Sequence, residues 1–505
     1  MKKIRVYSLL LSISLSLAGC GMNGSGEEEN SMAGDPVSRY MESREGESSA
    51  ADDSAGGSDG SESGDGGDEL PNIMENPAYS AMGRQVVTAV VTAPFRETMD
   101  RITAFNESSP DYFIEMKGYG GGAEQFEVLE TQLPLEVLSG KGPDLVIWDR
   151  MNYSPALASD RLMEDLYDFM DADPDFHRED YYGNILQAFE INEGLYICPA
   201  SFSVNTGCVR AEELETGRGV TESWTIGEMM ETYESSPRAN TFALNYSETL
   251  QLRIISADCM GNFIDWGSGK CCFDTPGFVE LLEWCNTFPE QLMVPGDYNV
   301  MEEIQSGRVF WQPVSLVEPW TVAYMEAASG DVDLLWPGHP VADGEGDMGG
   351  GVAAPHGECY SICRNSGNQE AAWEVIKSFL AEDAQREVQG IPLLRSVSEE
   401  RIQDALTVEY ETVDGVKQEK IKYQALMVIL EGRNEEVFEF SCITEEDAET
   451  YRSIIENTHR SYSSDPGILD IIMEEAGAYF GGDKDAAAVA DIIQNRVSMY
   501  VGERM

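Results

Sequence analysis

The stretch between Gln85 and Trp148 alternates strand-like and helix-like segments, and this alternation limits the possible folds more than any other feature of the sequence. Gln85–Val91 is a largely β-branched run that predicts a buried strand, and residues 95–105 then place apolar side chains at helical spacing. A second strand, a second helix and a third strand are expected over 112–116, 123–138 and 144–148. Such alternation is typical of a parallel sheet with helices on both faces and ligands at the carboxyl ends of its strands. The sequence therefore predicts an α/β fold.

The first twenty residues read as an export signal. A basic start is followed by an apolar run over residues 6–17, which has the length of a signal-peptide core and is too short to span a bilayer. The run ends in Leu17-Ala18-Gly19-Cys20, which resembles the bacterial lipobox, whose cysteine is diacylated and becomes the mature N-terminus. We therefore expect a lipoprotein signal peptide over 1–20, lipidation at Cys20 and a lipid anchor on the extracytoplasmic face of the cell membrane. An ordinary cleaved signal with an incidental cysteine is the alternative.

Residues 21–80 have the composition of a tether. They are rich in Gly, Ser, Asp and Glu, cannot bury a core, and predict a disordered acidic segment with a reach of about 40–45 Å. The segment carries a net charge of −13, and the signal region carries +3. Of the total of −58, −48 therefore falls on residues 81–505. Such a chain lacks the basic face that nucleic-acid binding requires, so the sequence excludes a nucleic-acid partner.

Eight short motifs follow one another between residues 105 and 380. They are Phe105-Asn106-Glu107 to Pro110-Asp111, Leu138-Ser139-Gly140-Lys141-Gly142-Pro143-Asp144-Leu145, Leu162-Met163-Glu164-Asp165-Leu166, Gly194-Leu195-Tyr196-Ile197-Cys198-Pro199, Ser203-Val204-Asn205-Thr206, Trp224-Thr225, Ser306-Gly307-Arg308 and Ala371-Ala372-Trp373-Glu374-Val375-Ile376-Lys377-Ser378-Phe379-Leu380. In order and spacing they resemble the family 1 extracellular solute-binding proteins, the sugar-type receptors of ABC importers that include maltose-binding protein. The resemblance covers most of residues 85–395. After that it becomes generic, and the sequence reads as mainly helical.

The resemblance implies a two-lobed fold of the type II periplasmic-binding-protein class, with a ligand cleft between two α/β lobes. The chain would cross between the lobes near 196–199, 334–337 and 392–394. One lobe would comprise residues 84–197 and 336–393, and the other would comprise residues 198–335 and 394–505.

A sugar cleft needs aromatic rings that stack on the C–H face of a pyranose, next to carboxylates and amides that bond its hydroxyls. Trp148 and Asp149 supply such a pair at a strand end, and Trp148 stands where the family has a cleft tryptophan. Trp320, in Pro319-Trp320, resembles the start of a cleft helix, with Tyr324 one helical turn on. The other candidates are Tyr119 and Glu124 around a glycine loop, Phe202 and Asn205 after the first crossing, and Trp311. A place in the core of a lobe is the alternative for the tryptophans.

Nine cysteines besides Cys20 stand in the folded part, and an odd number cannot all pair. Cys198 with Cys208, or Cys359 with Cys363, could form disulfides, and buried free thiols are the alternative. Cysteine and histidine spacings do not fit a zinc site, and the sequence holds no Gly-x-Ser-x-Gly or His-Glu-x-x-His motif. We therefore expect no catalytic residue, no metal and no cofactor.

The functional prediction that follows is a monomeric, membrane-anchored binding component of an ABC importer. It would capture a small solute, an oligosaccharide first of all, and deliver it to the permease subunits. A ligand that bridges both lobes would favour the closed state, which the permease recognises. Three alternatives stay open: a non-sugar solute such as a peptide or polyamine, a receptor that signals to a sensor kinase, and a surface carbohydrate-active enzyme.

Overall fold

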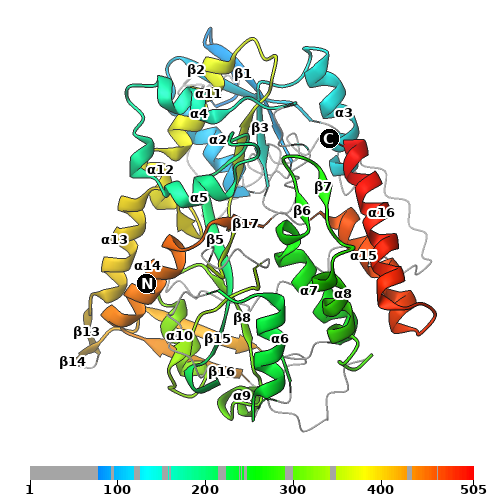
Figure 1. The fold of residues 1–505 in the computed structure, drawn as a ribbon. Helices are drawn as coiled ribbons and strands as arrows, with labels where there is room; N and C mark the ends of the chain where they lie inside the picture. The colour runs from blue at the N-terminus through cyan, green and yellow to red at the C-terminus, as the bar shows by residue number, and fades with distance from the viewer. Residues whose placement is uncertain are drawn as a thin grey trace, which may run out of the picture.

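The computed structural model describes the chain from residue 78 to residue 504 with several gaps. The described residues are 78–92, 96–118, 125–149, 157, 161–213, 223–237, 239, 241–243, 247–290, 300–341, 349–413, 415–428, 435–462 and 465–504. They form two lobes, each built around its own β-sheet (Figure 1). Cys20, the predicted signal peptide and nearly all of the predicted tether lie outside the described residues.

The first lobe contains a five-stranded sheet in the order β2-β1-β3-β11-β4. Its strands are β1 (Gln85–Val91), β2 (Tyr112–Met116), β3 (Leu145–Trp148), β4 (Cys198–Pro199) and β11 (Cys359–Ile362). β1 pairs in parallel with β2 and β3, as the sequence predicts, whereas β11 runs antiparallel to β3 and β4. The predicted bounds of the first two strands are confirmed residue for residue, because both are β-branched or aromatic runs that end at turns.

The second lobe contains a six-stranded sheet centred on β5. Its strands are β5 (Ser201–Arg210), β8 (Gln312–Leu316), β9 (Leu334–Leu335), β10 (Val352–Pro355), β12 (Ile391–Pro392) and β17 (Arg460–Ser461). β8, β9, β10 and β12 all pair antiparallel with β5, and β17 pairs in parallel with β10. β5 is buried along nearly its whole length, so the rest of this lobe is arranged around it.

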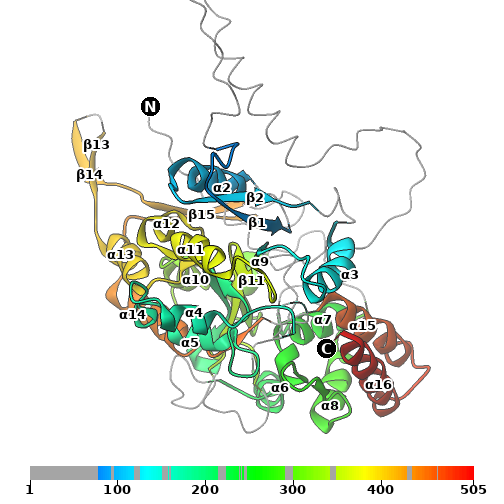
Figure 2. The same ribbon diagram turned by 90° about the horizontal axis from the view of Figure 1, so that it is seen from above.

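Helices cover both sheets. The first lobe carries α2 (Arg96–Ser108), α3 (Gln125–Leu138), α4 (Leu166–Ala172), α5 (Gly183–Ala188), α11 (Gln369–Leu380) and α12 (Glu382–Glu387). The second carries α6 (Ile226–Ser235), α7 (Glu248–Asp258), α8 (Pro276–Cys285), α9 (Val300–Gln305), α10 (Thr321–Ala328), α14 (Glu445–Glu456), α15 (Pro466–Phe480) and α16 (Ala486–Arg504). Between them, α13 (Arg395–Leu406) contacts both α12 and α14. Seen from above, α7, α8, α15 and α16 group at one side and α11 to α14 at the other (Figure 2).

Side-chain caps determine where several helices begin. Thr225 accepts a hydrogen bond from the Glu228 backbone, and the Glu228 side chain bonds back, which completes a capping box at α6. Thr444 and Asp447 do the same at α14. Asp465 caps α15 and is followed at once by a proline, which is well suited to the first helical position. These starts are therefore specified locally by the sequence.

Three crossings join the lobes. The first is Ala200, between β4 and β5; the second is 356–358, between β10 and β11; and the third is 388–394, between α12 and α13, which includes β12. The first directly follows the predicted 196–199, and the third includes the predicted 392–394. The second lies later than the predicted 334–337, because β10 pairs with β5 and so belongs to the second lobe, not the first.

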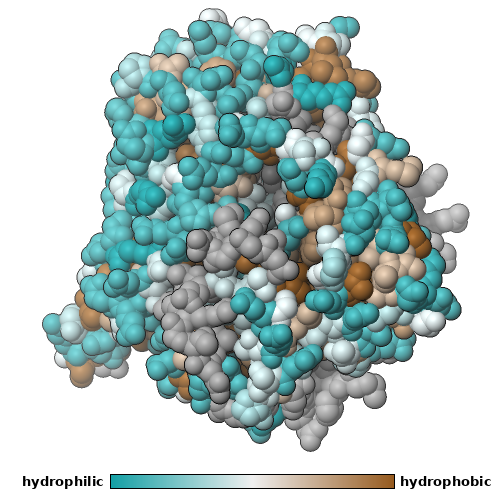
Figure 3. Space-filling model, in the orientation of Figure 1, coloured by the Kyte–Doolittle hydropathy of each residue, from teal (hydrophilic) through white to brown (hydrophobic). Residues whose placement is uncertain are grey.

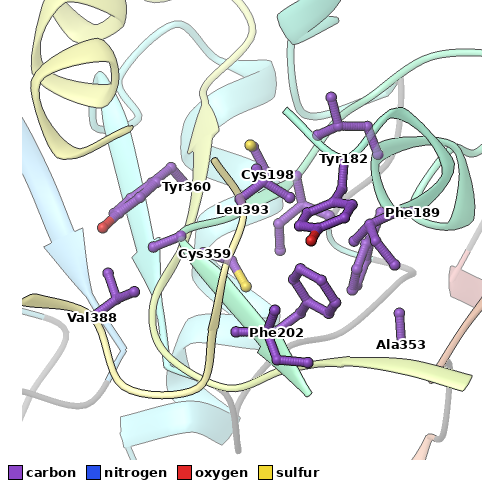
Figure 4. Close-up of a cluster of buried hydrophobic side chains, with 14 of the residues drawn as sticks. Tyr182, Phe189, Cys198, Phe202, Ala353, Cys359, Tyr360, Val388 and Leu393 are labelled. Carbon is purple, nitrogen blue, oxygen red and sulfur yellow. The ribbon is translucent and has the colours of Figure 1, made fainter. Parts of the chain in front are cut away.

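A shared apolar core runs through the crossings (Figure 4). Cys198 and Cys359 of the first sheet and Phe202 and Ala353 of the second have no exposed surface. The ring of Tyr182 meets that of Phe202 edge to face, with 5.7 Å between the ring centroids. The lobes are thus joined through a packed centre as well as through the chain.

The region after α13 is less helical than the sequence suggests. Two antiparallel hairpins separate α13 from α14: β13 (Tyr410–Val413) with β14 (Val416–Glu419), and β15 (Tyr423–Val428) with β16 (Glu435–Phe440). A small third hairpin joins β6 (Ile264–Asp265) and β7 (Lys270–Cys271). The prediction of a mainly helical end is wrong for β13 to β16, four strands that stand between α13 and α14. Figure 1 shows the β13–β14 ribbon projecting from the molecule, and all of its described residues are exposed.

The face in Figure 3 is largely hydrophilic, with an apolar patch over α3, where Leu135 is 70% and Leu138 is 47% exposed. Within the described ranges, no helix is both long and apolar enough to cross a membrane.

Candidate functional site

The carboxyl ends of the first-lobe strands lie toward the second lobe. Trp148, the last residue of β3, pairs with Cys359, the first residue of β11, and Cys359 also pairs with Pro199 at the end of β4. The neighbours Ala200 and Glu358 are already part of the crossings, where the Ala200 N–H donates to the Glu358 carbonyl at 2.8 Å. The strand ends at which α/β sheets bind ligands are therefore those next to the second lobe.

Thr92 and Asp149 stand at these strand ends. They follow β1 and β3 directly, and the Asp149 N–H donates to Thr92 Oγ1 at 2.7 Å. Both residues are nearly buried. The first lobe thus contributes a carboxylate and a hydroxyl, held in a fixed relation, at the junction.

The second lobe contributes a polar cluster of Asn205, Asp258, His339 and Arg460. Asn205 of β5 donates through Nδ2 to Asp258 Oδ1 at 3.4 Å, and His339 Nε2 lies 3.5 Å from Asp258 Oδ2. Arg460, at the start of β17, donates to the carbonyls of His339 and Gly349 at 3.3 Å each. We call these four residues the second-lobe polar cluster.

Burial determines the charge state of this cluster. It raises the pKa of Asp258 above its usual value, against the opposing effect of His339, and it lowers the pKa of His339. His339 Nδ1 and Trp311 Nε1, whose rings lie 5.2 Å apart, are buried without a hydrogen-bond partner in the part of the chain that the structure describes. Buried polar atoms normally have hydrogen-bond partners, so His339 of the cluster and the neighbouring Trp311 each keep one polar nitrogen that could still form a hydrogen bond.

Gln385 ties the first and third crossings together. Its Nε2 donates to the Ala200 carbonyl at 2.9 Å, and its Oε1 accepts the Leu394 N–H at 3.0 Å. The residue is fully buried on α12. One buried side chain therefore bonds both segments and couples the two crossings to each other.

Glu358 fixes the second crossing to α2. Its carboxylate accepts hydrogen bonds from Thr98 Oγ1 at 2.7 Å and from Arg101 at 2.6 Å, and Arg101 also donates to the Tyr360 hydroxyl at 3.1 Å. Only 10% of the Glu358 side chain is exposed, so its charge is balanced by Arg101 and hardly by water. Removing either partner would leave a poorly solvated charge at the junction.

Most of the aromatic side chains predicted to contact a ligand lie in the core. The buried residues are Trp148, Phe202, Trp311, Trp320 and Tyr324. The indole N–H of Trp148 donates to Ser361 Oγ at 2.8 Å. Trp320 stacks on Tyr423 of β15, with 5.9 Å between centroids, and Tyr324 meets Phe438 of β16 edge to face. In this conformation protein atoms pack around these rings, and their contact with a ligand stays a prediction.

The remaining predicted residues have mixed outcomes. Asn205 joins the second-lobe polar cluster, and Asp149 lies at the junction beside Thr92. Tyr119 and Glu124 lie outside the described residues. Sequence reasoning missed Asp258, His339, Arg460 and Gln385, because they come from distant segments and belong to no local motif. The one available signal was the turn-forming Pro337-Gly338-His339-Pro340, which holds one of only four histidines.

The cysteines of the folded part are free thiols, most of them buried. All nine cysteines of the folded part are free, so neither predicted pair forms a disulfide. Burial raises the pKa of Cys198 and of Cys259 to about 12, which keeps both protonated near neutral pH. The described ranges also contain no group of three or more side chains that could hold a metal ion. What the junction offers is a set of hydrogen-bond donors and acceptors suited to a polar solute.

No protein-family model matches this sequence, and no curated protein matches it. Among solved structures, the chain is similar to the cyclic α-maltosyl-1,6-maltose binding protein of Arthrobacter globiformis, with 15% identity over 83% of this chain and 100% of that chain and a TM-score of 0.47. It is also similar to the sugar-binding protein MalE of Xanthomonas citri, with 13% identity over 83% of this chain and 98% of that chain and a TM-score of 0.48. An extracellular solute-binding protein family 1 of Alicyclobacillus acidocaldarius is similar with 14% identity over 83% of this chain and 98% of that chain and a TM-score of 0.47. At these values the similarity assigns neither ligand nor partner. The strand pairings establish the fold: two α/β lobes joined by three crossings.

Proposed function

We propose that this chain is the extracytoplasmic solute-binding component of an ABC importer, anchored to the membrane through Cys20. It captures an oligosaccharide between its lobes and delivers it to the permease. The observation that carries the binding role is the arrangement of the junction, where both lobes place polar side chains close to three tied crossings.

The junction suits a ligand rich in hydroxyl groups. Asp149 and Asp258 accept hydrogen bonds, and Asn205 and Arg460 donate them. A hydroxyl does both, so a polyhydroxylated solute can satisfy a mixed set of this kind without carrying charge. Contact with both lobes would favour the closed arrangement over the open one.

Delivery to a permease and membrane anchoring are supported by sequence. The eight ordered motifs between residues 105 and 380 resemble the sugar-type receptors of ABC importers, and Leu17-Ala18-Gly19-Cys20 resembles a lipobox. Changing Cys20 to Ala should release the protein from membranes into soluble fractions. A variant that stays with washed membranes would contradict the lipid anchor.

A thermal-unfolding screen against neutral oligosaccharides, short peptides and polyamines tests the binding role. A ligand that binds only the folded protein stabilises it by roughly 2.7 kcal/mol when its concentration is about 100 times the dissociation constant. This stabilisation gives a clear rise in the midpoint temperature of unfolding. We expect the rise with an oligosaccharide, accompanied by a smaller radius of gyration in solution scattering. A rise only with a polyamine or a peptide would contradict the sugar assignment, and no rise with any class would contradict the binding role.

Asp258→Asn tests the site itself. It keeps the size of the side chain and removes a charged acceptor, so affinity for the solute should fall about ten-fold or more, as losing a hydrogen bond to a charged group does. Asp274→Asn, at an exposed position beyond β7, is the matched control and should bind as the wild type does. Equal affinity in both variants would place the ligand away from the second-lobe polar cluster.

A further inference from the structure

A pocket of about 400 Å³ lies on the first lobe, away from the junction residues described above. Its walls come from α4, from the short helical turn η2 (Arg178–Asp180), from α5 and from Arg395 at the start of α13. None of the residues that line it belongs to the second-lobe polar cluster or contacts Asp149 in any described bond. Its volume falls within the range of small-molecule sites.

Two arginines in this pocket have unused hydrogen-bond donors. The guanidinium of Arg178 lies 4.5 Å from the centroid of the Tyr167 ring, and its closest carboxylate, that of Asp171, is 3.5 Å away. Within the part of the chain that the structure describes, the Arg178 side chain makes no hydrogen bond. Arg395 donates from Nε to the Tyr181 carbonyl at 3.1 Å, and its Nη1 forms a longer ion pair with Glu456 at 3.7 Å, so its terminal nitrogens make no hydrogen bond within the described residues. Stacking on tyrosine holds such a planar group in place while its N–H edge stays available.

Four carboxylates balance these cations: Asp171 lies 3.5 Å from Arg178, Glu456 lies 3.7 Å from Arg395, and Glu179 and Glu190 line the pocket itself. Glu190 accepts the Tyr167 hydroxyl at 2.7 Å through one oxygen, and the side chain of Glu179 is 80% exposed at the rim. An anion would gain from the arginines and lose to the glutamates, and the net charge of −58 would repel it further. A cation would be attracted by the same net charge, but inside the pocket it would be repelled by both arginines. The lining therefore favours a ligand without net charge that accepts from guanidinium and donates to carboxylate, which is what hydroxyl groups do.

We infer that this pocket is a second binding site, for a neutral polyhydroxylated molecule of one or two sugar rings. The site is independent of the junction and does not require that the chain serve an importer. It also lies beside the third crossing, because Arg395 follows that crossing directly and its Nε is bonded to the first lobe at Tyr181. An occupant that bonds Arg395 would therefore touch a segment that takes part in any movement between the lobes.

Gly183 provides a clean way to close the pocket. It lines the cavity, and nothing lies within 4 Å of the point where a Cβ would stand, so Gly183→Leu adds an apolar side chain to the empty space without removing a charged group. Gly277, in the first turn of α8, has the same open surroundings, and Gly277→Leu is the matched control. Calorimetric titration of the full protein with glucose, maltose and other neutral mono- and disaccharides should show binding in the wild type and in Gly277→Leu that Gly183→Leu abolishes.

Removing a donor tests the chemistry of the pocket. Arg178→Gln should weaken the same binding about ten-fold or more, whereas Arg96→Gln, on an exposed part of α2, should leave it unchanged. Tighter binding of glucuronate or of a zwitterionic amino acid than of neutral sugars, if lost in Gly183→Leu, would overturn the neutral assignment. If no neutral sugar gives a binding signal that Gly183→Leu removes, the inferred second site is wrong.

Asp258→Asn separates this inference from the proposed function. It should leave the signal that depends on Gly183 unchanged, because Asp258 lies in the other lobe. If instead Asp258→Asn removes that signal and Gly183→Leu does not, the sugar binds at the junction. The second site would then be wrong while the proposed function would stand.

Discussion

The sequence around Trp320 is compatible with a ligand contact or with a place in the core, and in this structure the ring lies in the core. A tryptophan after a proline, at the start of a helix, is the pattern that suggests a ring open to ligand. In the folded chain the ring is 1% exposed and stacks on Tyr423, which lies 103 positions later in the sequence and so outside any local pattern. Because the ring is buried in this way, the main effect of Trp320 is to stabilise the folded state.

Trp320→Ala should therefore destabilise the protein by about 3–5 kcal/mol, the usual result of truncating a core tryptophan. Urea unfolding measures the change, and binding by the remaining folded protein should be unaffected. Tyr410→Ala, which removes a ring that is 56% exposed, should stay within about 0.5 kcal/mol of the wild type. Loss of binding with nearly full stability in Trp320→Ala would instead place the ring on the ligand.

Glu326 on α10 is expected to make stability depend on pH. Burial and the neighbouring carboxylates, Asp447 foremost, raise its pKa from the ordinary 4.5 to about 7. The folded state therefore holds a proton that the unfolded chain has released, and this contribution to stability is lost as pH rises from 4.5 through 7. Glu326→Gln should unfold like the wild type at pH 4.5 and be the more stable protein at pH 8. Glu449→Gln, an exposed change on α14, is the control, and equal curves for both variants would contradict the shifted pKa.

Among the elements, the two hairpins after α13 differ in what they support. β15–β16 packs against α10, where Tyr423 and Phe438 meet Trp320 and Tyr324. The β13–β14 ribbon is exposed along both strands, and its ends are joined because the Lys420 N–H donates to the Glu409 carbonyl at 2.9 Å. The β15–β16 hairpin therefore contributes to the core, whereas the β13–β14 ribbon does not.

Replacing residues 410–419 with Asn-Gly should leave stability unchanged. The new turn closes the same backbone ends, and no buried surface is lost, so the free energy of unfolding should stay within about 0.5 kcal/mol of the wild type. Chemical denaturation measures it. A drop of several kcal/mol would mean that the ribbon packs on a part of the molecule that its exposure does not suggest.

The sequence predicts local elements well and distant pairings poorly. Gln85–Val91 and Tyr112–Met116 were predictable because each is a continuous strand pattern between turn residues. The second crossing was not, because it depends on β10 pairing with β5, almost 150 positions earlier in the chain by residue number. The candidate site follows the same rule: Asn205 lies next to a recognisable motif, whereas Asp258 and His339 meet only through the fold.

For the molecule as a whole, the free thiols make stability independent of reducing agents. Seven of the nine cysteines are buried, and only Cys272 and Cys442 are partly exposed. The native protein without residues 1–20 should thus react with Ellman's reagent at no more than two thiols on a short time scale, and at all nine after denaturation. The midpoint of thermal unfolding should be the same with and without dithiothreitol. Fast reaction of more thiols, or a lower midpoint in reductant, would contradict this arrangement.

The three crossings also have a mechanical consequence. A single connection would let the lobes twist and swing freely, whereas adjacent connections tied by Gln385 resist torsion and leave bending as the easy motion. Covalent continuity is redundant as well: a protease that cuts one crossing leaves two intact links between the lobes. A nicked molecule would then run as fragments under denaturing electrophoresis and still sediment as one particle, with its bending axis largely preserved.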